Sequence, residues 1–423
     1  MSKIITNSTN TDVTNISRLS INTTTEFIYT TLLIIMWTIM IWITSLISKL
    51  ISLTVNIFNL GTGNTLPGYL VLKLFPNFLK YFSNRFKEVI IITGTNGKTT
   101  TSKLMAHALR SSGVAVVTNN SGSNLLRGIV TSLLLQTNFF GKSLATTLVL
   151  EVDEFNLPKV LESLPVTNIV LLNISRDQLD RYGETDIIFN RWVEALRKID
   201  FGAQHTNIHC FSDQPEFADL RNLLGNKAPV RFFGPASEVL DGTVLKGLHN
   251  QINAGAVVSV LKVIGVNTSD LKNSFKTLTH AYGRGERVKF QDSFFTITLA
   301  KNPASYNHNL DYLLSEPAFD AYLLILNDKI PDGRDVSWIY DIDSSKLQEL
   351  LRDKVIFVSG TRYLDMTIRL HYLGIETSSE NIGLNPEEIL KKMLRHKFSN
   401  VCVLPNYSAM LEIRKLVVGR SIL

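Results

Sequence analysis

Short apolar runs alternate with helical stretches along most of the chain. The runs lie at residues 89–92, 148–150, 169–172, 323–326, 355–358 and 401–404, and each ends in polar residues or glycine. Runs of this length between turn residues are typical of buried strands, and their alternation with helices indicates parallel sheets. We therefore predict two α/β domains, a central one at residues 58–287 and a C-terminal, Rossmann-like one at residues 288–423.

A longer apolar stretch precedes the first run. No charged residue occurs from Phe27 through Ser48, and a bilayer-spanning helix needs about 20 apolar residues. We predict a membrane-anchoring helix at residues 26–57; the alternatives are a buried core helix and a helix that lies in the membrane interface. Residues 1–25, which are rich in Asn, Thr and Ser, are predicted to form a disordered polar tail.

The basic residues around this stretch predict its orientation. Lys3 and Arg18 precede it, and the basic residues that follow it are Lys49, Lys73, Lys80, Arg85 and Lys87. The positive-inside rule predicts localisation at the cell membrane with the folded domains in the cytoplasm. The formal net charge of +6 weakly favours anionic partners, but no Lys/Arg block interleaved with aromatic residues indicates nucleic acid.

The two cysteines indicate neither a disulfide framework nor a zinc site. Cys210 and Cys402 lie far apart, and neither has a second Cys or a His at ligand spacing. No zinc is expected. Neither cysteine lies in the Gly-x-Cys-x-Gly setting of a glutaminase nucleophile.

A glycine-rich loop between the first run and a helix predicts a phosphate site. Backbone N–H groups and the helix N-terminus can cradle phosphates, Lys98 can neutralise them, and Thr99 can reach a magnesium ion. Ile92 occupies the place of the first Walker A glycine, and a glycine turn with a surface lysine is the alternative. Lys98 is the predicted catalytic residue. The predicted ATP-binding residues here are Gly94, Thr95, Asn96, Gly97, Lys98, Thr99 and Thr100.

An acidic run, Glu151-Val152-Asp153-Glu154, directly follows the apolar run at residues 148–150. The carboxyl ends of parallel strands are where α/β proteins place ligand groups. Together with Thr99, Glu151 is therefore the predicted magnesium ligand, and a solvated acidic loop is the alternative.

Several segments resemble those of the Mur ligases. The loop at residues 94–100 has their Gly-Thr-x-Gly-Lys-Thr-Thr form, residues 247–254 resemble Gly-x-His-Asn-x-x-Asn, and residues 283–287 resemble Gly-Arg-x-Glu. The resemblance implies that Asn250 and Arg284 contact the nucleotide, and no catalytic role is assigned to His249. Residues 173–183 resemble Asn-x-x-x-Asp-His-Leu-Asp, but Gln178 replaces the metal-binding histidine and leaves a second magnesium site open.

The remaining segments narrow the resemblance to the MurT family, from about Gly61 to the C-terminus. They lie at residues 65–68, 119–124, 177–184, 301–304, 332–341 and 404–407. The chain departs from that family in lacking the four-cysteine zinc ribbon of the central domain and in having a longer N-terminal apolar stretch. It also has no lysine that clearly matches the carbamylated lysine of many Mur ligases.

The resemblance implies a Mur ligase central ATP-binding domain and a C-terminal ligase domain that faces a glutaminase. The implied reaction is ATP-dependent amidation of the D-glutamate α-carboxylate of the lipid II stem peptide through an acyl phosphate. A GatD-type glutaminase subunit would supply the ammonia as part of a heterodimer. In that family the segment at residues 332–338 is thought to lend an acid to the partner's Cys-His pair, for which Asp335 is the best match and Asp341 the fallback.

Two rival functions are compatible with the same motifs. One is an amino-acid-adding Mur or folylpolyglutamate-type ligase, which Gln178 and the segment at residues 332–338 disfavour. The other is a non-catalytic, membrane-anchored nucleotide-binding scaffold, which an intact Lys98, Thr99 and Glu151 disfavour.

Overall fold

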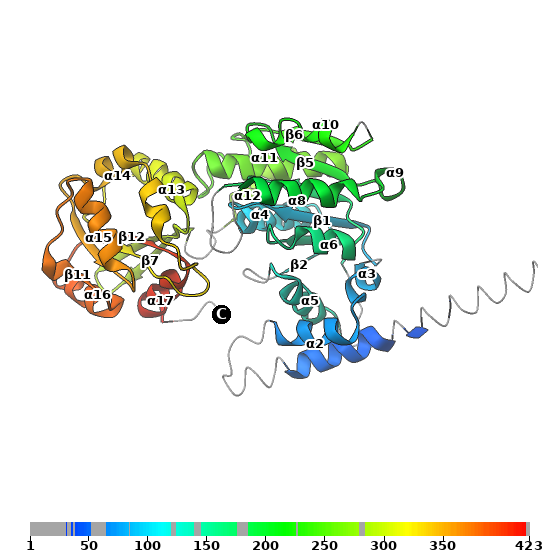
Figure 1. Ribbon diagram of the computed structural model, residues 1–423, viewed down its shortest axis with the longest axis horizontal. Helices are drawn as coiled ribbons and strands as arrows, with labels where there is room; N and C mark the ends of the chain where they lie inside the picture. Colours follow the sequence, from blue (N-terminus) through cyan, green and yellow to red (C-terminus); the bar gives the residue numbers. More distant parts are fainter. Residues whose placement is uncertain are drawn as a thin grey trace, which may run out of the picture.

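The computed structural model describes residues 31, 35–36, 39–51, 65–83, 85–119, 124–138, 145–175, 185–225, 227–278 and 284–419. Two α/β domains lie side by side, each built on a six-stranded sheet (Figure 1). The predicted polar tail at residues 1–25 and the segment that contains Gln178 lie outside the described residues.

The first sheet has the strand order β2-β3-β1-β4-β5-β6, and all of its neighbouring strands are parallel. Its strands are β1 (Glu88–Thr93), β2 (Val116–Thr118), β3 (Thr147–Glu151), β4 (Asn168–Leu171), β5 (Asn207–Phe211) and β6 (Val230–Phe233). Three of the predicted apolar runs are thus confirmed as β1, β3 and β4. Each is buried along almost its whole length, as expected of a strand covered on both faces.

Successive side chains of each strand of the first sheet point to opposite faces, and each face packs into its own hydrophobic cluster. In β1, Val89 and Ile91 belong to one cluster, whereas Ile90 and Ile92 belong to the other. This alternation follows from the two-residue period of a strand. The first cluster is covered mainly by α2 (Leu66–Leu74), α3 (Phe78–Ser83), α5 (Leu126–Leu135), α6 (Leu157–Ser163), α8 (Thr185–Arg197) and α10 (Leu220–Leu224). The second is covered by α4 (Lys98–Ser111), α11 (Leu248–Val263) and α12 (Leu271–Phe275).

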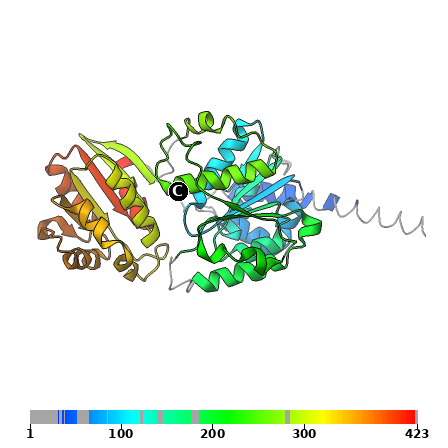
Figure 2. The ribbon, with the colours of Figure 1, turned by 90° about the horizontal axis from the view of Figure 1, so that it is seen from above.

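The second sheet has the order β11-β10-β9-β12-β8-β7. Its strands are β7 (Arg284–Phe290), β8 (Ser293–Thr298), β9 (Ala321–Ile325), β10 (Val355–Ser359), β11 (Ile382–Gly383) and β12 (Asn400–Pro405). Its helices are α13 (Pro303–Ser315), α14 (Ser344–Leu351), α15 (Tyr363–Tyr372), α16 (Pro386–Arg395) and α17 (Tyr407–Val418). Figure 2 shows this sheet with helices along both faces. The runs predicted at residues 323–326, 355–358 and 401–404 are confirmed as β9, β10 and β12.

The expectation of purely parallel sheets is wrong at one edge. β7 pairs with β8 in an antiparallel hairpin, because only Gln291 and Asp292 connect the two strands and so short a turn cannot make a parallel crossover. Gln291 takes a positive φ of 53° to close this turn. The predicted domain boundary between residues 287 and 288 falls within β7, which belongs to the second sheet.

The predicted membrane-anchoring helix at residues 26–57 is only partly described. Across the described ranges, no helix is both long enough and apolar enough to cross a membrane. Residues 39–51 do form a helix, and its Ile41, Thr44, Ser45 and Ser48 are buried. Ser45 lies 2.6 Å from Thr137 just beyond α5, measured between hydroxyl oxygens.

Candidate active site

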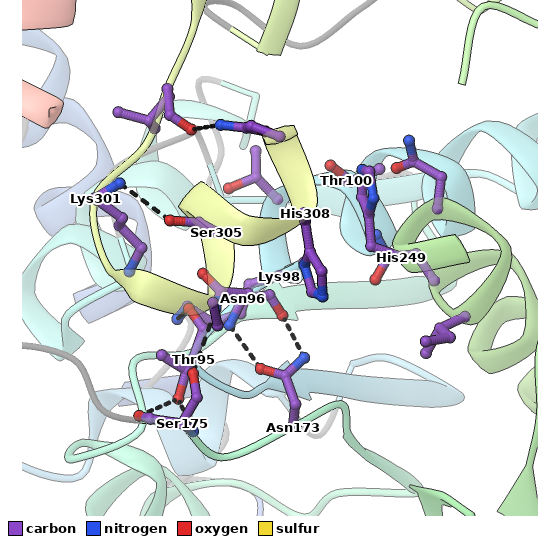
Figure 3. Close-up of a pocket in the computed structure, with 18 of the residues that line it drawn as sticks. Thr95, Asn96, Lys98, Thr100, Asn173, Ser175, His249, Lys301, Ser305 and His308 are labelled. Atoms are coloured by element: carbon purple, nitrogen blue, oxygen red, sulfur yellow. Dashed lines mark hydrogen bonds between the residues drawn. The ribbon is translucent and has the colours of Figure 1, made fainter. Parts of the chain in front are cut away.

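The glycine-rich loop lies between β1 and α4, as predicted, where β1 meets β4. Strands on the two sides of this point connect in opposite directions along the sheet, which leaves a crevice at their carboxyl ends. Asn173 follows β4 and fixes the loop: its Oδ1 accepts a hydrogen bond from Asn96 N at 2.9 Å, and its Nδ2 donates to Asn96 O at 3.0 Å. Its carbonyl accepts a third bond, 3.0 Å long, from Thr95 N. Figure 3 shows Asn173 beside Asn96.

Two positions of this loop require glycine. Gly94 has a φ of 137°, and a Cβ there would lie 2.9 Å from both Asn173 N and Asn173 O. Gly97 caps α4 with a φ of 88°, and a Cβ there would lie 2.3 Å from Asn253 Oδ1. The loop is therefore held between the end of β4 and helix α11 in one conformation.

Lys98, the first residue of α4, is buried and forms an ion pair with Glu154. Its Nζ donates to Glu154 Oε2 at 2.8 Å, and it also donates to the carbonyls of Gly94 and Thr95. Burial by itself would raise the pKa of Glu154, but the charges of Lys98 and Lys301 outweigh this and hold the pKa below its ordinary value. The ammonium group is thus fixed beside the loop whose N–H groups can bind phosphate.

Glu151, the predicted magnesium ligand, is positioned through its backbone. Asn119 donates from Nδ2 to Glu151 O and accepts at Oδ1 from Glu151 N, each at 2.8 Å. Glu151 and Thr99 both line the cavity described below. Within the described part of the chain, no three His, Cys, Asp or Glu residues form a metal cluster. A hydroxyl and a carboxylate fit Mg²⁺, because this ion keeps several waters and takes its remaining ligands from substrate phosphates.

The second domain brings a helix N-terminus to the same place. Asn302 and Ser305 form a capping box at the start of α13, directly after β8. The side-chain amides of Asn302 and Asn96 pair across the two domains, with 3.3 Å from Asn302 Nδ2 to Asn96 Oδ1. Lys301, whose amide donates to Ser305 Oγ at 3.0 Å, lines the cavity beside this helix end (Figure 3). The N-termini of α4 and α13, with Lys98 and Lys301, therefore border one space.

That space is an interdomain cavity of about 610 Å³, large enough for a nucleotide with its phosphates. On its α11 side lie Asn250, a predicted nucleotide contact, and His249. The ring of His249 stacks on that of His308 from α13, with 5.4 Å between centroids and 11° between planes. Burial lowers the pKa of His308, which favours the neutral form of this ring. Lys246 reaches Glu316 of the second domain at 2.8 Å.

The predicted partner-facing acids lie outside the cavity. Asp335 is exposed, and its Oδ1 accepts a hydrogen bond from Ser337 N at 2.8 Å; Asp341 is also exposed. Asp332 of the same segment instead lines the cavity and accepts from Ser408 N at 2.9 Å. Arg284 begins β7, but its side chain lies outside the described part of the structure.

Both thiols are buried within strands. Burial raises the pKa of Cys210 to about 12, and it raises the pKa of Cys402 still further. Neither thiol lines the cavity.

Sequence reasoning missed three residues that complete the site. In the acidic run, the sequence favours Glu151 over Glu154. Asn173 and Lys301 occur only as members of segments that resemble those of the Mur ligases and the MurT family. Asn173 and Lys301 each follow the carboxyl end of a strand, and this position was a usable signal.

Two families of known proteins match this chain. Residues 92–268 match the family described as Mur ligase middle domain, and residues 299–410 match the family described as MurT ligase C-terminal. The lipid II isoglutaminyl synthase (glutamine-hydrolyzing) subunit MurT of Staphylococcus aureus strain COL is 29% identical over 374 residues, which cover 74% of this chain and 84% of that protein. The subunit of the same name from Streptococcus pneumoniae strain R6 is 28% identical over 429 residues, with coverages of 86% and 94%.

A solved structure supports the same fold. The MurF ligase of Thermotoga maritima, in complex with ADP, matches with a TM-score of 0.60 and 16% identity, covering 83% of this chain and 82% of that one. The chain has the fold of the Mur ligases, and its MurT relatives and Mur ligase middle domain indicate an ATP-dependent ligase. Through its C-terminal domain and these relatives, it is most specifically similar to the MurT-type Mur ligases.

Proposed function

We propose that the chain is the ligase subunit of a lipid II isoglutaminyl synthase, which amidates the α-carboxylate of D-glutamate in the stem peptide of lipid II. The observation that carries this proposal is the meeting of the loop at residues 94–100 with the N-terminus of α13 in one cavity. This gives phosphate-binding groups on both sides of a single space. The match of residues 299–410 to the MurT ligase C-terminal family favours amidation over the addition of an amino acid.

In the first step, a carboxylate oxygen of the substrate attacks the γ-phosphorus of ATP. The bond from phosphorus to the β,γ-bridging oxygen breaks, ADP leaves, and an acyl phosphate forms. Lys98 exchanges its bond to Glu154 for one to the phosphates, while the loop N–H groups hold them in place. Mg²⁺ held by Thr99 and Glu151 would supply charge neutralisation when bound. Asn250 and Arg284 contact the nucleotide outside the reacting phosphate.

In the second step, the nitrogen lone pair of ammonia attacks the carbonyl carbon of the acyl phosphate. The C–O bond to phosphate breaks, inorganic phosphate leaves, and the nitrogen loses one proton to give the amide. Lys301 and the N–H groups at the start of α13 lie on the side of the cavity from which they can stabilise the departing phosphate.

The ammonia comes from a GatD-type glutaminase in a heterodimer. The chain has only two cysteines, and both are buried with raised pKa values, so neither is suited to attack glutamine. Asp335 is exposed on a loop outside the cavity, where it can face the partner's Cys-His pair.

The test is mass spectrometry of lipid II after incubation with the purified chain, ATP and an ammonium salt, which replaces the partner. Conversion of acid to amide supports the proposal. Addition of the mass of an amino acid would instead identify an amino-acid-adding ligase. No change in lipid II while ATP still binds would identify a nucleotide-binding scaffold.

A further inference from the structure

The helix at residues 39–51 has the reverse polarity of an ordinary surface helix. Most of its buried residues are polar, and its exposed residues are apolar. Its buried side is made of Ile41 and of three small polar residues, Thr44, Ser45 and Ser48, each at most 3% exposed. Its outer side is apolar. The exposed side chains of this helix and of the two described residues just before it are Ile35 (49%), Met36 (54%), Ile39 (51%), Trp42 (41%), Ile43 (43%), Ile47 (45%) and Leu50 (55%). A helix against water shows the opposite pattern.

α2 extends this apolar surface. Gly68 packs α2 so tightly on α5 that a Cβ at this position would lie 1.9 Å from Arg127 O. The outward residues of α2 are again large and apolar: Leu66 (48%), Tyr69 (38%), Leu70 (37%) and Leu74 (69%). Ser45 donates to the carbonyl of Leu134, and the amide of Gly68 donates to the hydroxyl of Thr131; both acceptors lie in α5. The two helices therefore pack on the same helix. Figure 1 places them at the end of the first domain opposite β6.

The segment that contains these two helices carries charge of one sign. From Phe27 through Lys87 the sequence contains five basic residues and no Asp or Glu, a formal charge of +5 against +6 for the whole chain. Lys73, Lys80, Arg85 and Lys87 are exposed. Bulky exposed apolar side chains on a segment whose only charged residues are lysine and arginine are typical of helices that lie in the headgroup region of a bilayer with anionic lipids.

We propose that the helix at residues 39–51 and α2 form a docking surface that inserts into the interface of an anionic lipid bilayer without crossing it. The surface acts as follows. Trp42 and the isoleucines lie among the acyl chains near the headgroups, and the basic residues contact the lipid phosphates. The buried Thr44, Ser45 and Ser48 stay on the protein side, where Ser45 bonds to Leu134 of α5, so docking requires no unfolding. This inference goes beyond the proposed function and does not depend on it, because binding to lipid requires no turnover.

The experiment is vesicle flotation with the purified full-length chain. Vesicles of phosphatidylcholine with phosphatidylglycerol are compared with vesicles of phosphatidylcholine alone, at low and high salt. We expect the chain to float with the anionic vesicles and to bind less at high salt. Ile43→Glu/Ile47→Glu should lower this binding at least tenfold, and Lys73→Gln should lower it about fivefold, the effect of one basic residue at an anionic surface.

The matched control is Leu364→Glu/Ile368→Glu on α15. These residues have the same spacing and similar exposures, 54% and 49%, but lie in the second domain. We expect this pair to leave flotation unchanged, with ATP binding confirming that both double variants are folded. Equal loss in both pairs, or no binding to anionic vesicles by the unaltered chain, overturns the proposal. A dimer that Ile43→Glu/Ile47→Glu dissociates, in the absence of vesicle binding, overturns it in favour of a contact between two copies.

Discussion

Lys98 and Glu154 form a buried ion pair on the wall of the interdomain cavity, with 2.8 Å between Nζ and Oε2. Both side chains are less than a tenth exposed. The lysine that we propose for ATP binding is therefore paired with a carboxylate, and a bound phosphate must compete with that carboxylate for it.

Lys98→Ala should lower ATP-dependent amidation by about a hundredfold or more, because one preorganised charge is lost from a closed site. The same substitution leaves Glu154 buried without its partner, which should cost about 3 to 5 kcal/mol of stability. The double variant Lys98→Ala/Glu154→Gln removes that charge as well. We expect it to regain thermal stability but not turnover, as measured by calorimetry and by phosphate release. Recovery of turnover in the double variant would show that Lys98 serves only the fold.

Asp335→Asn should separate the two nitrogen sources when the chain is assayed with its glutaminase. An acid behind a catalytic histidine orients the imidazole and stabilises its cation, so glutamine-dependent amidation should fall sharply. Amidation driven by an added ammonium salt should stay near normal, because Asp335 lies outside the cavity. Full activity of Asp335→Asn with glutamine would move this role to Asp341, the fallback, and Asp341→Asn tests that outcome in the same assay. Equal loss with both nitrogen sources would place Asp335 in the ligase site or in the fold.

Gly97→Ala should weaken ATP binding more than tenfold, because the new methyl group would collide with Asn253 Oδ1 and displace the loop. Gly113→Ala is the control: Gly113 has a similar φ of 80°, but no atom lies within 4 Å of its Cβ position. That variant should lose only about 1 kcal/mol from backbone strain and should bind ATP normally. Titration calorimetry with a non-hydrolysable ATP analogue measures both. If the two variants bind ATP equally well, the loop does not need this conformation.

His209 should make the stability of the chain fall in mild acid. Burial, and then the charge of Arg231, lower the pKa of His209 from 6.5 to about 4. Its Nε2 lies 3.1 Å from Asn168 Oδ1, to which it can donate, and in the neutral ring its Nδ1 can then accept from the Ser259 hydroxyl at 2.7 Å. Between these two pKa values the unfolded chain binds more protons than the folded chain, so the free energy of unfolding decreases as pH falls.

The contribution of His209 should amount to a loss of about 2 kcal/mol between pH 7.5 and pH 5. His209→Gln should remove this part of the pH dependence, whereas His205→Gln, at an exposed position, should retain it. Urea unfolding at the two pH values measures the difference. An unchanged slope in His209→Gln would mean that the ring is protonated inside the fold.

The sequence predicted best where local pattern decides structure. A short apolar run such as the one at residues 89–92 is stable only when both of its faces are buried, as in the middle of a parallel sheet. The conformation of the loop at residues 94–100 is predicted by its glycines. Contacts between distant residues could not be predicted. Asn96 and Asn302 are 206 positions apart, and the pair of Glu286 with Arg414, which ties β7 to α17, spans 128. The sequence around either residue of such a pair does not indicate which distant residue it contacts.

The N-terminal segment shows a different limit. Its apolar content predicted a membrane anchor, but content alone does not show which face of a helix packs on the protein. Thr44, Ser45 and Ser48 are polar, yet they are buried together with Ile41, whereas most of the large apolar residues of this helix are exposed. The contacts of Ser45 with Leu134 at the end of α5 and with Thr137 just beyond it show which side faces the protein.

The way in which the two domains touch bears on how fast the enzyme can turn over. Among the described residues, each hydrophobic cluster belongs to one domain alone, and the domains meet through polar or ring contacts such as Asn96 with Asn302, His249 with His308 and Lys246 with Glu316. Each such contact is worth on the order of 1 kcal/mol or less, and breaking it exposes little apolar surface. The domains can therefore separate at low cost. ADP release should be a matter of domain opening, and its rate should respond to substitutions at these contacts rather than to changes in either core.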